Sequence, residues 1–215
     1  TRIWLVLLLS IALAAAVSAQ SLKLKSMDIQ PIQLNKNLVT NYSFEQGLNT
    51  PEGYIWDKRN TDAICVLDSS ITHSGKNSLK LTNKTPFGAH IYGMLTASSP
   101  IEMEAGNPYT LSAWVKSDDP GIAWIGGGNG WQFRMGLPNT KGKWQRVSTT
   151  FTPSASDVPF ILRIIIESPS SGIWIDDVKL EYGSENSPVE SAGASEAIQM
   201  NTSNIEKVVQ GDGDF

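Results

Sequence analysis

The sequence predicts an all-β domain, a sandwich or jelly roll, for the central part of this 215-residue chain. Its 18 Gly and 11 Pro residues separate short runs rich in Val, Ile and Thr, which is typical of domains built from many short strands. Apolar and polar residues alternate within several runs, so one face of each strand turns toward a core. The central part shows no long amphipathic helical pattern.

The alternation is clearest in two of the expected strands. Leu79 and Leu81 alternate with polar neighbours, and Leu111, Ala113 and Val115 do the same. Strands are expected near residues 63–67, 78–83, 89–96, 109–116, 131–136, 145–151, 160–166 and 173–181. Their spacing, with turn residues between them, predicts two packed sheets.

Residues 1–19 are predicted to be a secretory signal peptide. Arg2 precedes an apolar run over residues 3–16, and Val17 and Ala19 suit cleavage after Ala19. The run is short for a membrane span, although an uncleaved anchor is the alternative. Since the sequence does not begin with Met, we expect it to start within a longer reading frame. A secreted protein, extracellular or periplasmic and free of the membrane after cleavage, is therefore expected.

The rest of the chain is divided by composition. Residues 20–36 form a polar lead-in, residues 37–183 the β-domain, and residues 184–215 a linker or the start of a further domain. The net charge of −4, with basic residues scattered, does not indicate nucleic-acid binding. Cys65 is the one cysteine, so no internal disulfide can form, and a small buried apolar role is expected for it.

Five motifs in order resemble the carbohydrate-binding modules of families 4 and 9. They are Asn-Leu-Val-x-Asn-x-x-Phe-Glu from residue 37, His-Ser-Gly-Lys-Asn-Ser-Leu-Lys-Leu from residue 73, the strand 109–116, Gly-Lys-Trp at 142–144 and Ile-Asp-Asp-Val at 175–178. The resemblance covers residues 37–183. It implies a galactose-binding-like jelly-roll sandwich without catalytic residues, which binds a polysaccharide or oligosaccharide on a concave, aromatic-lined face. It also implies a role in targeting an attached enzyme, often a glycoside hydrolase.

Two carboxylates suggest a metal site. Glu45 ends the first motif, and Asp176 lies with Asp177 inside an apolar run, where a buried carboxylate needs a cation or hydrogen-bond donors. A strand end in water is the alternative. The resemblance implies a structural calcium ion held by Glu45, Asp176, the carbonyl of Ser43 and a carbonyl near Asn77. The sequence departs from relatives at Tyr42 and Ser43, where small residues are common.

Aromatic residues around a glycine-rich turn suggest the sugar site. A sugar-binding site needs aromatic planes for stacking and polar groups that bond to the sugar hydroxyls. The glycine-rich residues 126–130 are flanked by Trp124, Trp131, Phe133 and Arg134. The resemblance implies that Trp131 faces Phe87, with His90, Tyr92 and Arg134 as hydrogen-bonding neighbours and Trp56 at the rim. Core packing is the alternative for these residues, and it is the expectation for Trp114 and Trp144.

Two other functions remain open at this level. A glycoside hydrolase fragment needs two carboxylates across a cleft. The available carboxylates, none of them in a recognisable acid–base motif, are Glu102, Glu104, Asp118, Asp119 and Glu167. The second alternative is a secreted adhesion or structural β-sandwich.

Overall fold

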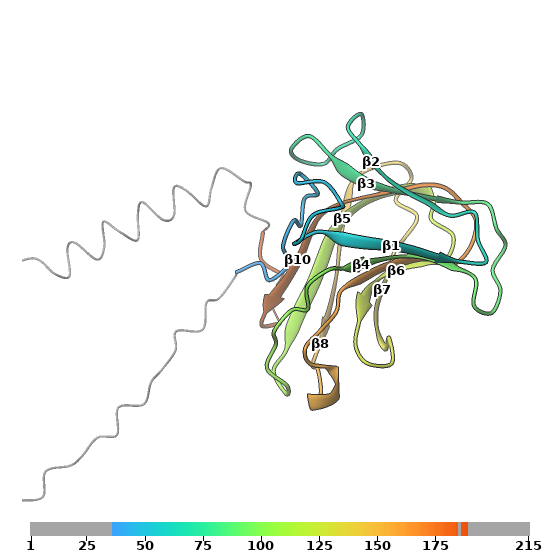
Figure 1. Cartoon of the computed structure of the whole chain (residues 1–215). Coiled ribbons are helices and arrows are strands. Elements are labelled where there is room, and N and C mark those ends of the chain that lie inside the picture. The colour runs from blue at the N-terminus through green and yellow to red at the C-terminus, as the bar shows by residue number, and fades with distance from the viewer. Residues whose placement is uncertain (1–35, 185, 189–215) are drawn as a thin grey trace, which may run out of the picture. The chain divides into compact units, whose positions relative to one another are not determined.

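The computed structural model of the chain describes residues 36–184 and 186–188. The expected signal peptide, most of the lead-in and most of the segment 184–215 lie outside the described residues. Within them, two antiparallel five-stranded sheets face each other as a sandwich (Figure 1). No helix in this part is long and apolar enough to cross a membrane. The predicted all-β fold is confirmed.

We call the two sheets A and B. Sheet A has the strand order β1 (Tyr54–Arg59), β4 (Tyr92–Ala97), β9 (Arg163–Ile166), β6 (Ala123–Gly127) and β7 (Phe133–Gly136). Sheet B has the order β2 (Ile64–Asp68), β3 (Ser78–Asn83), β10 (Ser170–Tyr182), β5 (Tyr109–Asp119) and β8 (Gln145–Phe151). A short 3-10 helix, η1 (Ala155–Asp157), precedes β9.

The core lies between the sheets and follows the alternation seen in the sequence. Leu79 and Leu81 of β3 and Leu111 of β5 are almost completely buried, and Leu95 and Ile164 face them from sheet A. Removing this much apolar surface from water is the main stabilising contribution to such a fold. Cys65 packs against the core, and burial raises the pKa of its thiol to about 12.

The prediction misses two strands, begins three others two or three residues too early and begins β10, expected from residue 173, too late, since it starts at Ser170. β1 and β6 are absent from it, because β1 ends in Asp57, Lys58 and Arg59 and β6 ends in two glycines, which are poor strand signals. Where strands were expected from residues 89, 131 and 160, the structure begins them at 92, 133 and 163. His90 and Trp131 have positive φ angles of 59° and 56°, which places both in turns rather than strands.

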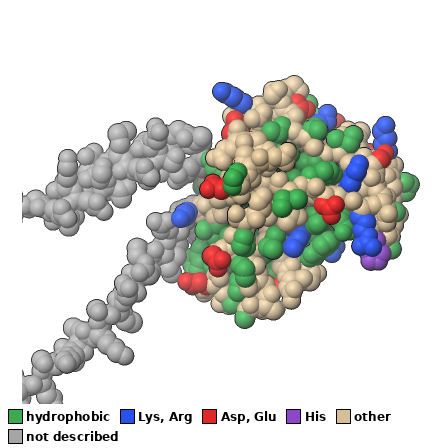
Figure 2. Space-filling view, viewed as in Figure 1, with side chains coloured by type: hydrophobic (Ala, Val, Ile, Leu, Met, Phe, Trp, Pro, Cys, Tyr) green, Lys and Arg blue, Asp and Glu red, His purple; other side chains and the backbone are tan. Residues whose placement is uncertain are grey.

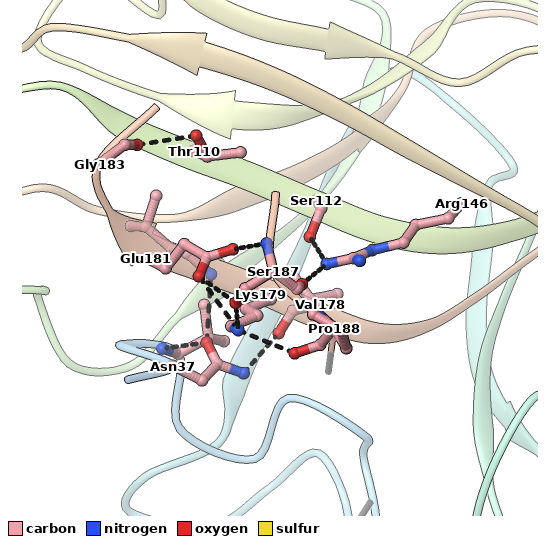
Figure 3. A network of polar contacts seen from close by, with 12 residues as sticks. Asn37, Thr110, Ser112, Arg146, Val178, Lys179, Glu181, Gly183, Ser187 and Pro188 are labelled. Carbon is pink, nitrogen blue, oxygen red and sulfur yellow. Dashed lines mark hydrogen bonds and ion pairs between the residues drawn. The ribbon is translucent and has the colours of Figure 1, made fainter. Parts of the chain in front are cut away.

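Both ends of the described segment dock on β10. Near the start, Leu38 N–H donates to the Leu180 carbonyl (2.8 Å). The Asn37 side-chain amide donates to the Val178 carbonyl, and its Oδ1 accepts from Leu180 N–H. Near the end, Ser187 N–H donates to Glu181 Oε1 (2.9 Å). Figure 3 shows these contacts side by side. The docked residues 186–188 lie beyond residue 183, where the sequence analysis ends the domain.

A buried ion pair lies beneath this docked segment. Lys179 Nζ is 3.2 Å from Glu181 Oε2, and both side chains are almost fully buried. Lys179 also donates to the Pro188 carbonyl (3.0 Å) and the Ser187 hydroxyl, while Arg146 donates to the Ser187 carbonyl (Figure 3). Ser187 and Pro188 therefore add hydrogen-bond acceptors for buried Lys179 and half-buried Arg146.

Candidate functional site

The outer face of sheet A, which we call the sheet A face, carries apolar side chains that the core does not use. The register pairs Trp124 of β6 with Ile165 of β9, and Ile165 with Met94 of β4. Trp124 is 3% exposed and Ile165 is 0% exposed, although neither belongs to the core cluster between the sheets. Something on the outer side must therefore cover them.

The loop before β7 supplies part of that cover through Trp131. The Trp131 ring is 6.1 Å from the Trp124 ring, and it meets Tyr92 of β4 edge-on at 5.9 Å. Trp131 itself stays half-exposed. Three aromatic rings from two strands and one loop thus converge on the sheet A face, and part of this surface remains open to a ligand.

Asp157 anchors the loop that carries Trp131. Its Oδ1 accepts from Asn129 N–H (3.1 Å) and from the Gln132 side-chain amide. Its Oδ2 accepts from the hydroxyl and the N–H of Ser154. The hydrogen bond from the Ser154 hydroxyl is the main reason why the pKa of Asp157 is lowered to about 2, so the anchor is charged at neutral pH. The anchor links η1 to both sides of Trp131 in sequence.

Charged groups surround the aromatic rings. The Arg134 guanidinium lies 4.6 Å from the Trp124 ring centroid, and the Arg163 guanidinium lies 5.5 Å from that of Trp131. Glu167 Oε2 accepts from Trp124 Nε1 (3.1 Å), and Arg134 Nε donates to the Trp131 carbonyl (2.7 Å). This arrangement combines aromatic planes for stacking with donors and acceptors for hydroxyl groups.

The two carboxylates predicted to hold a metal approach one loop from different elements. Glu45 Oε1 accepts from Lys76 and Asn77 N–H (2.8 and 2.9 Å), and Asp176 Oδ2 accepts from His73 and Ser74 N–H (2.9 and 3.1 Å). Loop 73–77 therefore lies between the carboxylates. Ser43 is in the turn whose Tyr42 carbonyl accepts from Val178 N–H (3.0 Å), two residues beyond Asp176.

Asp176 is a buried anion without a cationic partner in the part of the chain described. Its side chain is 0% exposed, and burial raises the pKa of its carboxyl to about 6. The His73 ring instead contacts Asp177, with Nδ1 2.7 Å from Oδ2, and stacks on Trp114 at 3.9 Å. Among the described residues, no three His, Cys, Asp or Glu side chains gather at one point. A cation at Asp176 would need backbone carbonyls among its ligands.

The sequence model of a carbohydrate-binding domain family, CBM_4_9, matches residues 36–172, more than half of the chain. The chain belongs to this family. The resemblance seen in the sequence motifs is thereby confirmed, and carbohydrate binding is the function of the domain at this level. No curated protein matches the sequence.

Solved structures with a similar fold include further carbohydrate-binding modules. TmCBM61 in complex with beta-1,4-galactotriose is 15% identical, with a TM-score of 0.47 over 69% of this chain and 99% of that one. A second similar structure holds the CBM22-1 and GH10 modules of Clostridium thermocellum endo-1,4-beta-D-xylanase 10B, complexed with xylohexaose. It is 15% identical, with a TM-score of 0.47 over 73% of this chain and 30% of that one. A bacteriophage CBA120 tailspike protein 4 domain is 14% identical, with a TM-score of 0.49 over 68% of this chain and about a fifth (21%) of that one.

In this carbohydrate-binding domain, three of the six predicted sugar contacts come together. Trp131, Tyr92 and Arg134 all lie at the sheet A face, as described above. Phe87 is 61% exposed in the loop before β4, where no other aromatic ring among the described residues packs against it, and exposed His90 accepts a hydrogen bond from Asn60 through its carbonyl. Sugar contacts by Phe87 and His90 stay predictions.

Trp56 lies on the other side of sheet A. It pairs with Leu95 in the register and packs against the core near Gly93. Its proposed place at the rim of the sugar site stays a prediction. Sequence reasoning placed Trp124 beside the glycine-rich turn of the sugar site, but it did not assign Arg163 and Glu167 to this face. Once β6 and β9 are paired, their alternation places all three residues on the outer side.

Proposed function

We propose that this domain binds a polysaccharide on the sheet A face without catalysing its cleavage. The observation that carries the proposal is the convergence of Trp131, Tyr92 and Trp124 outside the sandwich core. The C–H face of a sugar ring packs on an exposed aromatic plane, and the hydroxyl rim bonds to nearby guanidinium and carboxylate groups. Arg134 and Glu167 supply those groups beside the rings.

The proposed biological role is to hold an attached enzyme near its substrate. Binding one part of a protein to a polymer raises the effective concentration of any catalytic domain joined to it. The signal peptide expected from the sequence supports a role outside the cell or in the periplasm, where polysaccharides are accessible. The enzyme expected from the family resemblance is a glycoside hydrolase.

The binding proposal is tested by affinity electrophoresis of the full chain through gels that contain xylan, β-glucan, mannan or galactan. At least one polymer should retard the chain, and Trp131→Ala should weaken retardation about tenfold or more, since stacking partners dominate such sites. Trp174→Ala is the matched control, because it removes an indole from the outer face of sheet B. Equal retardation of the parent and a folded Trp131→Ala variant would contradict the placement of the site.

We also propose a structural calcium ion near Glu45 and Asp176. The support is chemical, because calcium takes several carboxylate and carbonyl oxygens in flexible geometry and Asp176 is a buried anion without a cationic partner in the described part of the chain. The proposed ligands are the two carboxylates, the Ser43 carbonyl and a carbonyl near Asn77. They would tie the N-terminal turn and loop 73–77 to β10.

Thermal unfolding with and without calcium tests this second proposal. Added calcium should raise the melting temperature of chelator-treated protein, since a ligand that binds the folded state stabilises it. Asp176→Asn should abolish the calcium response while the protein stays folded. A melting temperature that is identical with calcium and with chelator would remove the ion from the account.

A further inference from the structure

Two guanidinium groups at the sheet A face have no carboxylate partner among the described residues. Arg134 of β7 and Arg163 of β9 lie in one cross-strand row, on either side of Gly126 of β6. The ion pairs of the described part lie elsewhere: His73–Asp177, Lys80–Asp68 and Lys179–Glu181. The two arginines are thus charges without a counter-ion in the described part of the chain.

Their hydrogen-bonding capacity is also largely unused. Arg134 Nε donates to the Trp131 carbonyl (2.7 Å), and Arg163 Nη1 donates to the Ile161 carbonyl (3.2 Å). Each guanidinium has five N–H donors, and no further bond to either group forms within the described residues. Several donors of each fork are therefore available to a bound molecule.

The aromatic rings hold both guanidinium groups beside the proposed sugar site. Arg134 lies over Trp124, Trp124 contacts Trp131, and Arg163 lies over Trp131. A guanidinium held against an indole keeps its in-plane N–H groups free, and this planar fork matches an anionic oxygen pair. A bound glycan would therefore meet a guanidinium group and an aromatic ring side by side at this face.

We propose that the glycan bound at the sheet A face is acidic, with carboxylate or sulfate groups received by Arg134 and Arg163. This inference rests on the proposed function, and it adds the chemical class of the ligand. Hydrogen bonds between a guanidinium and an anion are roughly twice as strong as neutral ones, so an acidic glycan is favoured over its neutral counterpart.

The acidic residues on the same face do not cancel this preference. Glu167 accepts from Trp124 Nε1 and forms no ion pair with Arg134 or Arg163, and Asp57 lies in β1, two strands away from Arg163. Arg59 of β1 adds a third basic group to the face. The whole chain has a net charge of −4, and Figure 2 shows acidic and basic side chains mixed on the face in view. Selectivity for acidic glycans would therefore come from local arginines rather than from bulk charge.

The test compares matched pairs of polymers in affinity gels with the full chain. The pairs are polygalacturonate and its methyl ester, glucuronate-substituted xylan and its carboxyl-reduced form, and sulfated and desulfated galactan. Stronger retardation by the charged member of a pair is expected, and the pair that responds distinguishes carboxylate from sulfate. Retardation by neutral members that equals or exceeds that by charged members would overturn this inference and leave the proposed function standing. Free migration in every gel would reject both.

Variants that each remove one positive charge test whether binding to the charged polymers depends on these two arginines or on the overall charge of the protein. Arg163→Gln and Arg134→Gln should each weaken binding to the charged polymer about tenfold, because each removes a charge-assisted contact. Lys143→Gln is the control, since exposed Lys143 lies in the turn before β8 and its loss changes the net charge equally. An equal loss in Lys143→Gln, or no loss in either arginine variant, would contradict the inference. Circular dichroism confirms that each variant is folded.

Discussion

Asp157 shows how a single residue outside the sheets positions the proposed binding surface. It accepts hydrogen bonds from residues on both sides of Trp131, and it is 4% exposed. Trp131 has a positive φ angle, a conformation that a tryptophan adopts only when neighbouring contacts hold it. The anchor therefore matters for binding although it lies outside the aromatic cluster.

The depressed pKa of Asp157 predicts a pH dependence. The folded state holds the carboxylate at a pKa of about 2, below the ordinary value of 3.8, so its stabilising effect is complete above about pH 4 and is lost as pH falls toward 2. We expect the melting temperature of the parent to fall more steeply over this range than that of Asp157→Asn. Melting curves recorded at several pH values measure both slopes. Parallel slopes would show that Asp157 has no such role.

Sequence patterns located some residues of the face and missed others for a physical reason. Aromatic and turn signals pointed to Trp131 and Arg134 beside the glycine-rich turn, and the family resemblance added Tyr92. Arg163 lies in β9 and Glu167 directly follows it, both distant in sequence from the turn, and only the pairing of this segment with β6 and the residue before it brings them there. Such cross-strand neighbours depend on register, which local alternation does not specify.

At the scale of elements, β6 places the aromatic cluster against the rest of sheet A. A Cβ on Gly127 would lie 2.4 Å from the Ile161 carbonyl oxygen and 2.7 Å from the Phe160 ring. The strand therefore needs a glycine where the chain enters the Trp131 loop. The two glycines that make β6 a weak strand in sequence serve this close packing.

Gly127→Ala should destabilise the domain by about 1–3 kcal/mol, because backbone and a buried ring must move to admit the methyl group. Gly136→Ala is the matched control in the neighbouring strand, since a Cβ there meets nothing within 4 Å. Urea unfolding of both variants measures the difference. Equal stability of the two variants would mean that β6 is less tightly packed than described.

Across the whole domain, β10 connects both ends of the described segment. Sequence motifs identified this strand and its acidic pair, because the apolar run 173–182 is long and interrupted by two carboxylates. They did not predict that residues 186–188 dock on it, since a Ser-, Asn- and Pro-containing segment is typical of a linker. Its role follows from the buried Lys179–Glu181 pair that it covers.

Lys179→Met should destabilise the domain by about 3–5 kcal/mol, because it leaves Glu181 as a buried charge without its partner. The double variant Lys179→Met with Glu181→Leu should recover part of this loss, since it removes both charges. Urea unfolding of the parent and both variants gives the comparison. A single variant as stable as the parent would show that the pair is not buried in solution.

The central claim is that carbohydrate binds on the outer face of sheet A. The most direct test is a titration of the full chain, followed by nuclear magnetic resonance of the seven Trp indole N–H groups, with an oligosaccharide cut from the polymer that retards the chain most. The account predicts that the Trp124 and Trp131 signals shift, while those of Trp114 and Trp174 on sheet B stay in place. Shifts at Trp114 and Trp174 with unchanged Trp124 and Trp131 would contradict it.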